Sequence, residues 1–480
     1  MIRVFTFFLL FLNYQVIFSQ NLYPYGNEFP LGLYSLHTDL DSANYYGWNH
    51  GHRYGYRIDG IRYLATPIPD SYYIECKENN ICTMARLSWI DSLDKKWPPS
   101  VETTEGEITQ QEYHSNISWW DIPEELRYWK NSEYYIVKKY PELIREYDSK
   151  KRPTYMYIPG HYNSQGVENY VPYLDILSAS CYSNYQNLPN IYVRWSIERT
   201  QKAIINKGFK AGKDYLNNEK TVIAILELFE QEAILSENET WHDFWLALAC
   251  DVKGIQVFSH FYRNSSLTLK KSWNTLNRAI KIFKENKIDK AILDGNNIFL
   301  HNRILSGPSS APLLVMQNIT YTHPSLKILA KEYNDTTYVI AVNSAEEKIT
   351  FQITDIPPLI IGARKILSNE FIEIKKQVIT DTLKALDVAL YKLYTDKSKI
   401  ESLIYPCPAE NNITIKIINS NITFDKVKIF DISGEFIKEE VCDYCLEKSI
   451  DIKHHSIGTY IIQLLRNGEQ IATNKFVISY

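Results

Sequence analysis

The sequence lacks the features that mark several common classes of protein. Its 52 Lys and Arg residues are balanced by 56 Asp and Glu residues, so no basic surface indicates a nucleic-acid partner. No set of Cys and His residues has the spacing of a structural zinc site, and we expect neither a metal ion nor a cofactor. A Gly-x-Ser-x-Gly motif is also absent, which argues against a hydrolase with a serine nucleophile.

Long apolar runs are absent beyond the N-terminus. Residues 4–12 form a short apolar core after the positively charged Arg3, and the small residue Ser19 follows a few positions later. This pattern is typical of a secretory signal peptide that is cleaved after Ser19, and its apolar core is too short to span a bilayer. We therefore expect residues 1–19 to be removed and the mature chain to be exported without a transmembrane segment.

Cysteine is scarce, with seven residues in the chain. Export allows disulfides to form. Cys76 and Cys82 flank a polar loop and could pair, whereas Cys442 and Cys445 enclose only Asp-Tyr and could form a tight disulfide or a weak redox or metal motif. An odd number of cysteines leaves at least one thiol unpaired within the chain.

Aromatic residues, by contrast, are abundant. The chain has ten Trp and 36 Tyr residues, and the last Trp in the sequence is Trp273. An AT-rich codon bias accounts for part of the Tyr excess. Because sugar rings present flat C–H faces that stack on aromatic rings, this composition suits a cleft that binds a glycan.

Short strand-like runs alternate with amphipathic helical stretches from Phe29 to Asp294. Strands are expected at 29–36, 60–66, 82–90, 117–120, 153–159, 174–182, 221–229 and 254–261, and residues 39–52 are expected to be helix or loop. About eight such units fit an α/β fold of the (β/α)₈ TIM-barrel type over residues 20–300, because parallel strands need a crossover between them. The alternative is a doubly wound open sheet, but no Gly-rich phosphate loop follows a predicted strand.

The pattern changes in the last third of the chain, where strand-like runs predominate. These runs predict an accessory β-sandwich over residues 301–396, followed by the short polar linker Asp396-Lys-Ser-Lys399. Short alternating strands then predict a small antiparallel, Ig-like β-sandwich over residues 403–480. On its own, this last pattern is equally typical of a generic adhesion module.

Three ordered motifs lie in the last segment. Ile404-Tyr-Pro-Cys-Pro-Ala409 opens it, Val427-Lys-Ile-Phe-Asp-Ile-Ser-Gly434 follows, and Ile457-Gly-Thr-Tyr-Ile-Ile462 comes near the end. Their order resembles the type A sorting domain of the type IX secretion system, although Cys407 stands where that family usually has Asn. The resemblance implies that the type IX machinery carries the chain through the periplasm and outer membrane. It also implies removal of this domain, with the remainder secreted or anchored at the cell surface.

Carboxylates follow two of the predicted barrel strands, and active sites of TIM barrels lie at the C-terminal ends of their strands. Asp121 and Glu124 follow the fourth strand, and Glu227 ends the seventh, which is otherwise apolar. A lone carboxylate there is costly to bury unless it is paired or functional. Glycoside hydrolysis requires two such groups on either side of the scissile bond.

Carboxylates after strands four and seven are the arrangement of clan A glycoside hydrolases, which residues 29–286 resemble. The resemblance implies a carbohydrate substrate, with Glu227 as nucleophile or base and Glu124 as acid. Such families often carry the acid immediately before the proline that follows strand four, but here that residue is Ile122. Either Glu124 or Asp121 replaces it, or the barrel is a degenerate surface protein that binds carbohydrate or acts in adhesion without cleavage. A structural protein whose strand-end face is filled by side chains is a third hypothesis.

Other side chains at predicted strand ends are candidates for contacts with a sugar. They are Trp119, Trp120, Tyr182, His260, Tyr262, His37, Asp39 and His161. Because strand residues alternate in direction, at most one of Trp119 and Trp120 faces the site. The carboxylates also have structural alternatives: Glu124 could stabilise the start of a helix, and Glu227 could pair with a buried arginine such as Arg194.

Overall fold

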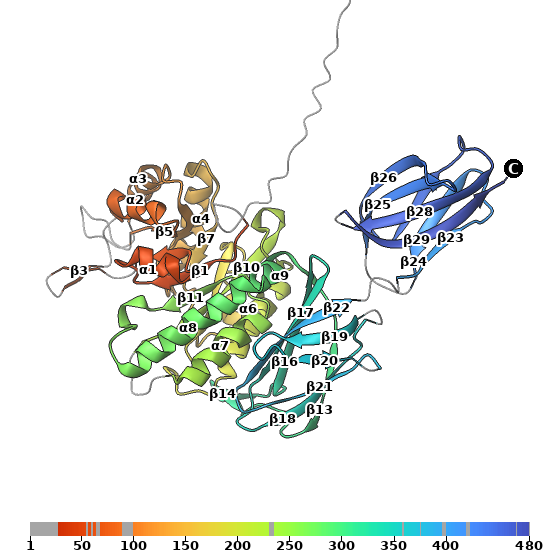
Figure 1. Cartoon of the computed structure of the whole chain (residues 1–480). Coiled ribbons are helices and arrows are strands. Elements are labelled where there is room, and N and C mark those ends of the chain that lie inside the picture. Colours follow the sequence, from red (N-terminus) through yellow and green to blue (C-terminus); the bar gives the residue numbers. More distant parts are fainter. Residues whose placement is uncertain are drawn as a thin grey trace, which may run out of the picture.

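The computed structural model describes residues 27–53, 56–58, 61–63, 68–88, 99–229, 235–357, 360–374, 376–395, 400–418, 423–466 and 468–479. An α/β barrel comes first, a set of antiparallel sheets follows, and a small C-terminal sandwich ends the chain (Figure 1). The barrel runs from red to green in Figure 1, the accessory strands are teal to light blue, and the C-terminal domain is darker blue.

Within the described residues, eight parallel strands close into a barrel. Their order is β11-β1-β2-β5-β6-β7-β8-β10, and β10 pairs with β11 to complete the ring. The strands are β1 (Leu31–Tyr34), β2 (His50–His52), β5 (Cys82–Arg86), β6 (Ile117–Asp121), β7 (Thr154–Met156), β8 (Ile176–Cys181), β10 (Glu219–Glu227) and β11 (Ile255–Phe258). This closed ring confirms the predicted TIM barrel and is incompatible with an open sheet.

Helices cover the outside of the barrel. They are α1 (Leu40–Tyr45), α2 (Asp70–Glu78), α3 (Val101–Gln111), α4 (Asn131–Tyr147), α5 (Ser164–Glu168), α6 (Tyr192–Asn206), α7 (Glu237–Ala249), α8 (Leu267–Glu285) and α9 (Ile288–Asp294). Polar side chains cap several of these helices at their N-termini. For example, Ser236 and Glu239 form a capping box at the start of α7. The shorter elements are β3 (Tyr56–Ile58), β4 (Ile61–Tyr63), β9 (Lys210–Ala211), η1 (Tyr215–Asn217) and η2 (His260–Tyr262).

The second barrel strand differs from the prediction. It is β2, at residues 50–52, within the segment expected to be helix or loop. Of the run 60–66 that was expected to form this strand, residues 61–63 pair with β3 in a separate hairpin, and residues 60 and 64–66 lie outside the described residues. The prediction was wrong because β2 reads His-Gly-His, which carries no apolar pattern, yet all three residues are buried.

Alternate residues of each strand face the barrel axis and the surrounding helices. In β10, Ile223 and Ile225 pack in the interior cluster, whereas Ala224 and Leu226 belong to the layer between strands and helices. This periodicity gives the continuous apolar run of a strand buried on both faces. It also places Glu227 two residues beyond Ile225, at the end of the inward-facing series.

Polar side chains also cross the interior of the barrel. Gln256 of β11 donates from Nε2 to His50 Nδ1 at 2.9 Å. This contact requires glycine in the neighbouring strand, because a Cβ atom at Gly32 would lie 2.0 Å from Gln256 Oε1. On its other side, His50 Nε2 pairs with Ser118 Oγ.

The accessory domain packs directly on the barrel. One sheet has the order β12-β16-β17-β22-β19-β20, a second has the order β13-β18-β21, and β14 and β15 form a hairpin. In the first sheet, Tyr338 and Ile340 join the barrel core, whereas the alternating Val339 and Ala341 join the core between the two sheets. The barrel and this sheet therefore share one apolar core. The strands are β12 (Asn296–Asn297), β13 (His301–Ser306), β14 (Leu314–Met316), β15 (Ile319–Tyr321), β16 (Leu326–Tyr333), β17 (Thr336–Asn343), β18 (Ile349–Thr354), β19 (Ile360–Lys365), β20 (Phe371–Glu373), β21 (Ile379–Leu383) and β22 (Val388–Thr395).

The C-terminal domain has its own core between two antiparallel sheets, ordered β23-β24-β27 and β26-β25-β28-β29. Arg466 connects it to the accessory domain through ion pairs with Glu332 (3.1 Å) and Asp335 (2.7 Å). The strands are β23 (Ser402–Tyr405), β24 (Asn412–Ile417), β25 (Phe424–Asp431), β26 (Phe436–Cys445), β27 (Glu447–Asp451), β28 (Gly458–Arg466) and β29 (Glu469–Ile478).

In the described part of the chain, no helix is long and apolar enough to cross a membrane.

Candidate active site

Glu227 ends β10, the seventh strand of the barrel, and its side chain is buried, with 4% of the residue exposed. Its Oε2 atom accepts a hydrogen bond from the backbone N–H of Tyr185 at 3.2 Å. Its Oε1 atom has no hydrogen-bond partner among the described residues. Burial raises the pKa of Glu227 to about 7; the Tyr185 hydrogen bond opposes this rise, and the negative charge of Asp243 adds to it. A carboxyl group in this environment remains partly protonated at neutral pH.

Asp121 ends β6, the fourth strand, and is also buried. Its Oδ2 atom accepts a hydrogen bond from His52 Nε2 at 2.7 Å, and His52 is the last residue of β2. Burial lowers the pKa of His52, and this effect outweighs the nearby Asp121, which raises it. A neutral imidazole that donates from Nε2 therefore fixes the orientation of the Asp121 side chain.

Aromatic rings connect the surroundings of the two carboxyl groups. The ring of Tyr34 lies 4.5 Å from that of His52 and 5.7 Å from that of Phe258. Phe258 lies 5.6 Å from Phe229, which lies 5.7 Å from Tyr185, all between ring centroids. The contacts run without a break from the partner of Asp121 to the partner of Glu227. This ring layer lies at the C-terminal ends of β1, β10 and β11.

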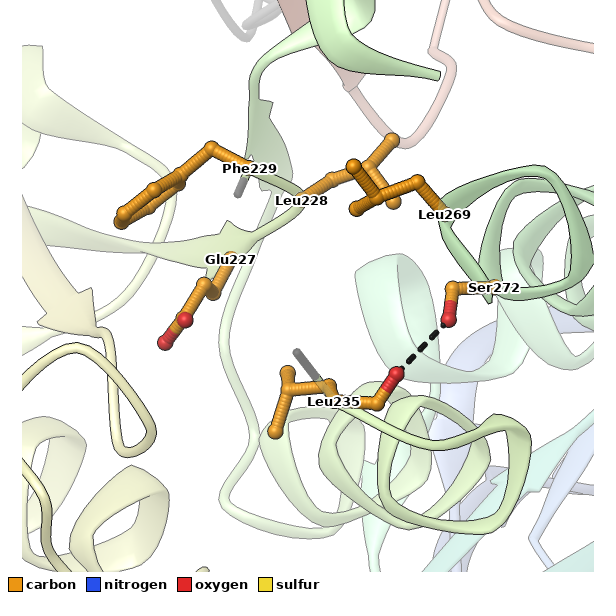
Figure 2. A pocket seen from close by; sticks show the side chains of 6 residues that line it. All are labelled: Glu227, Leu228, Phe229, Leu235, Leu269 and Ser272. Atoms are coloured by element: carbon orange, nitrogen blue, oxygen red, sulfur yellow. Dashed lines mark hydrogen bonds between the residues drawn. The ribbon is translucent and has the colours of Figure 1, made fainter. Parts of the chain in front are cut away.

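A small recess lies beside Glu227, on the side of α8. It is too narrow to hold a water molecule. Its lining residues are Glu227, Leu228, Phe229, Leu235, Leu269 and Ser272. Figure 2 shows that the Glu227 carboxylate points away from Leu269 and Ser272, and that Ser272 is hydrogen-bonded to Leu235. The recess is therefore not a cleft for a sugar ring in this conformation.

Trp119 and Trp120 point to opposite sides of β6, as their alternation predicts. Trp119 packs inside the barrel, 4.2 Å from His50 between ring centroids. Trp120 faces outward, and its indole N–H donates to Asp148 at 2.9 Å. Both rings are fully buried, so neither presents a face to a ligand.

Glu124 lies in the turn after β6 and is half-buried. The turn is closed by the left-handed residue Glu125, whose N–H donates to Tyr157 O at 3.1 Å. Glu124 is close enough to Tyr155 and Tyr157 for its charge to raise the pKa of both phenols, although burial is the main cause. Because α4 begins only at Asn131, Glu124 is not at the start of that helix.

The other predicted contact residues fall into two groups. On the side of the first and eighth strands, Asp39 forms an ion pair with Arg263, and His260 is buried beside Trp273 at 5.5 Å between ring centroids. Burial lowers the pKa of His260 to about 3, with smaller effects from Arg263 and His37. His37 and Tyr262 are half-buried.

The second group lies after the fifth and sixth strands. Tyr182 packs in the ring layer, 5.3 Å from Phe229 and 6.2 Å from Phe258 between centroids. His161 is exposed, and its carbonyl accepts a hydrogen bond from Gln317 of the β14–β15 hairpin at 2.9 Å.

One feature of the site was not predicted. Asp243 is a buried acid on α7 that lies close enough to Glu227 for its negative charge to raise the pKa of that carboxyl group. Its signal in the sequence was an acid within a long apolar helix. Glu227 does not pair with Arg194, which binds Glu198 at 2.8 Å instead. Among the described residues, no group of three or more His, Cys, Asp and Glu side chains could hold a metal ion.

Residues 403–479 match a known family, the secretion system C-terminal sorting domain. The C-terminal domain is thus a sorting domain. This confirms the resemblance seen in the sequence and indicates export to the outer membrane, the cell surface or the medium. The sorting domain also implies the type IX secretion machinery as a partner. A comparison with curated protein sequences gives no match.

The rest of the chain is similar in fold to glycoside hydrolases of known structure. An Anoxybacillus α-amylase superimposes with a TM-score of 0.51 at 7% identity, over 77% of this chain and 98% of the amylase. A family 5 glycoside hydrolase from Bacteroides vulgatus gives 0.49 at 11% identity, over 77% and 89%. A GH27 β-L-arabinopyranosidase from Geobacillus stearothermophilus gives 0.48 at 9% identity, over 78% and 98%. At these identities the likeness shows the barrel fold alone.

Proposed function

We propose that the exported barrel hydrolyses a glycosidic bond in a polysaccharide or oligosaccharide. The observation that carries this proposal is the pair of buried carboxyl groups at the ends of strands four and seven, which lie in different environments. Glycoside hydrolysis needs one carboxyl group that donates a proton and one that acts as a carboxylate. When the surroundings of two acids push their pKa values apart, one can act as the proton donor and the other as the carboxylate.

Glu227 suits the role of proton donor. Its pKa of about 7 keeps a substantial protonated fraction at neutral pH, and a general acid works best when its pKa is near the working pH. This assignment replaces the nucleophile or base role that the sequence suggested. The buried Oε1 atom, which has no partner among the described residues, is the atom that would give its proton to the leaving oxygen.

Asp121 suits the role of the second carboxylate. It ends its strand, and the hydrogen bond from His52 orients it. Glu124 lies three residues further on, in the turn, and remains the alternative for this role. Tyr185 is 51% exposed and its backbone already contacts Glu227, so its ring is the accessible aromatic surface on which a sugar would stack.

The test is an assay of the mature chain on chromogenic glycosides and polysaccharides. Glu227→Gln is expected to lower kcat by about 10²- to 10⁴-fold, the usual contribution of a general acid. Glu237→Gln, an exposed position at the start of α7, is the matched control and should retain activity. Asp121→Asn and Glu124→Gln distinguish the two candidates for the second role. Unchanged turnover in Glu227→Gln would refute the proposed mechanism.

A second function is favoured by a specific observation, namely that the buried Ile122 stands before Pro123, where related barrels often carry the acid. If this acid has been lost, the protein binds carbohydrate without cleaving it. Calorimetric titration with oligosaccharides would then show saturable binding, and chromatography of the same mixture would show no product. Hydrolysis that Glu227→Gln abolishes would exclude this alternative.

A further inference from the structure

Two cysteines of the sorting domain lie together at one edge of a sheet. Cys442 and Cys445 belong to β26, which stands at the end of the order β26-β25-β28-β29. In a regular strand, residues three positions apart point to opposite faces. Here both side chains pack against the core of the domain and both are partly buried.

A bulge in β26 explains why the two thiols share a face. Val441 pairs with Lys426 of β25, and Cys445 pairs with Phe424. Four steps along β26 therefore correspond to two steps along β25, so β26 accommodates additional residues at this point. Within the bulge, Tyr444 adopts a left-handed conformation with φ of 44°, which interrupts the regular alternation of side chains between the two cysteines.

The two thiols lie near each other on the core side of β26. The Cys442 thiol donates a hydrogen bond to the carbonyl oxygen of Phe424 at 3.2 Å, and burial together with the nearby Cys442 raises the pKa of Cys445. Elsewhere in the described chain, Cys76, Cys82, Cys181 and Cys250 are buried and Cys407 is exposed. The pair in β26 thus combines proximity with partial access to solvent.

We propose that Cys442 and Cys445 form a disulfide bond when the chain leaves the cytoplasm. The sorting domain directs the chain into an exported compartment, where disulfides form and persist. The reaction is an exchange with a disulfide donor. One thiolate attacks the donor disulfide and releases a donor thiol, and the second thiolate then attacks the mixed disulfide and releases the other. The two cysteines lose two electrons and two protons, and the donor disulfide is reduced to two thiols.

The bond would fix the bulge at the sheet edge. An open edge strand can pair with a strand of another molecule, and bulges are one means by which proteins prevent this. Val441 and Tyr444 at the bulge are 65% and 49% exposed, so this part of the edge presents apolar side chains to solvent. The disulfide would close a loop of only a few residues. It would therefore lower the entropy of the unfolded chain little and add little stability, so we expect it to be readily reduced.

The test uses the full chain exported to a bacterial periplasm and alkylated before lysis. Peptide mapping without reductant should show one peptide that contains both cysteines, is two hydrogens lighter than the dithiol form and carries no alkyl group. The same peptide should carry two alkyl groups after treatment with dithiothreitol. Cys407→Ser is the matched control and should retain the cross-link.

Two results would overturn the proposal. One is alkylation of both Cys442 and Cys445 in exported wild-type chain, and the other is a cross-link from either residue to Cys407 or to a second chain. Because the mapping uses the wild-type protein, it does not depend on the folding of a variant. As a further measurement, Cys442→Ser should leave Cys445 open to alkylation, and unchanged protection of Cys445 in that variant would also contradict the bond.

Discussion

Replacing Glu227 with Gln should separate the electrostatic cost of this buried carboxyl group from its role in catalysis. The folded protein holds the Glu227 proton more tightly than the unfolded chain does, since its pKa is raised from 4.5 to about 7. A group with a raised pKa in the folded state favours folding fully below the unfolded pKa. That advantage is lost as the pH rises through the folded pKa. The wild-type barrel is therefore expected to lose stability between about pH 4.5 and pH 7.

The size of the effect follows from the two pKa values. The difference between 4.5 and about 7 corresponds to about 3 kcal/mol at about 1.4 kcal/mol per pH unit. Glutamine carries no charge at any pH and so lacks this dependence. Its amide can keep the hydrogen bond from Tyr185 but adds a buried donor, which costs about 1–3 kcal/mol if it is unpaired. This second cost does not vary with pH, so it cancels when two pH values are compared.

The assay is urea unfolding of the mature wild-type and Glu227→Gln proteins at pH 5 and at pH 8. Between these values, the variant should gain about 2–3 kcal/mol in unfolding free energy relative to wild type. Glu237→Gln provides the control, because an exposed carboxylate should show little such gain. A difference between Glu227→Gln and wild type that does not change with pH would refute the environment described here for Glu227. If Glu227→Gln is more stable than wild type at pH 8 and no longer hydrolyses the substrate, Glu227 is retained for function at the expense of stability.

Three further predictions concern other polar groups. Asp243→Asn removes a negative charge that raises the pKa of Glu227, so the alkaline limb of the pH–rate profile should move to lower pH. His52→Phe leaves the buried Asp121 without its imidazole donor and should destabilise the barrel by about 1–3 kcal/mol in urea unfolding. Arg466→Ala removes both ion pairs between the sorting and accessory domains, and small-angle X-ray scattering should then show a larger radius of gyration.

The sequence predicts the elements of this fold that carry a strong local pattern. The continuous apolar run that ends at Glu227 is β10, and the alternation of Trp119 and Trp120 gives one inward and one outward ring, as observed. The apolar residues Ile136, Tyr140, Leu143 and Ile144 recur at helical spacing and lie in α4, which spans 131–147. In each case, burial requires apolar residues to recur at the spacing of the helix or strand. This spacing can be read from the sequence without knowledge of the fold.

The parts that the sequence did not predict depend on distant contacts. The pair of His52 and Asp121 joins residues 69 positions apart. β2 is a strand because neighbouring strands enclose it, although its residues His-Gly-His have low strand propensity. The ring layer likewise gathers Tyr34, Tyr182 and Phe258 from separate strands. Such contacts follow from closure of the barrel, which no local pattern specifies.

The accessory domain and the candidate site form one structural unit. Leu314 and Met316 of the β14–β15 hairpin pack against Ile191, which ends the same loop whose Tyr185 N–H binds Glu227. A second contact joins His242 of α7 to Ser344 of the accessory domain at 3.0 Å. The loop and the helix that determine the environment of Glu227 are thus both supported by the accessory sheets. The sorting domain has a core of its own and touches the accessory domain through Arg466. Its removal after export would therefore leave the surroundings of Glu227 intact, whereas loss of the accessory domain would expose the barrel core and release the loop.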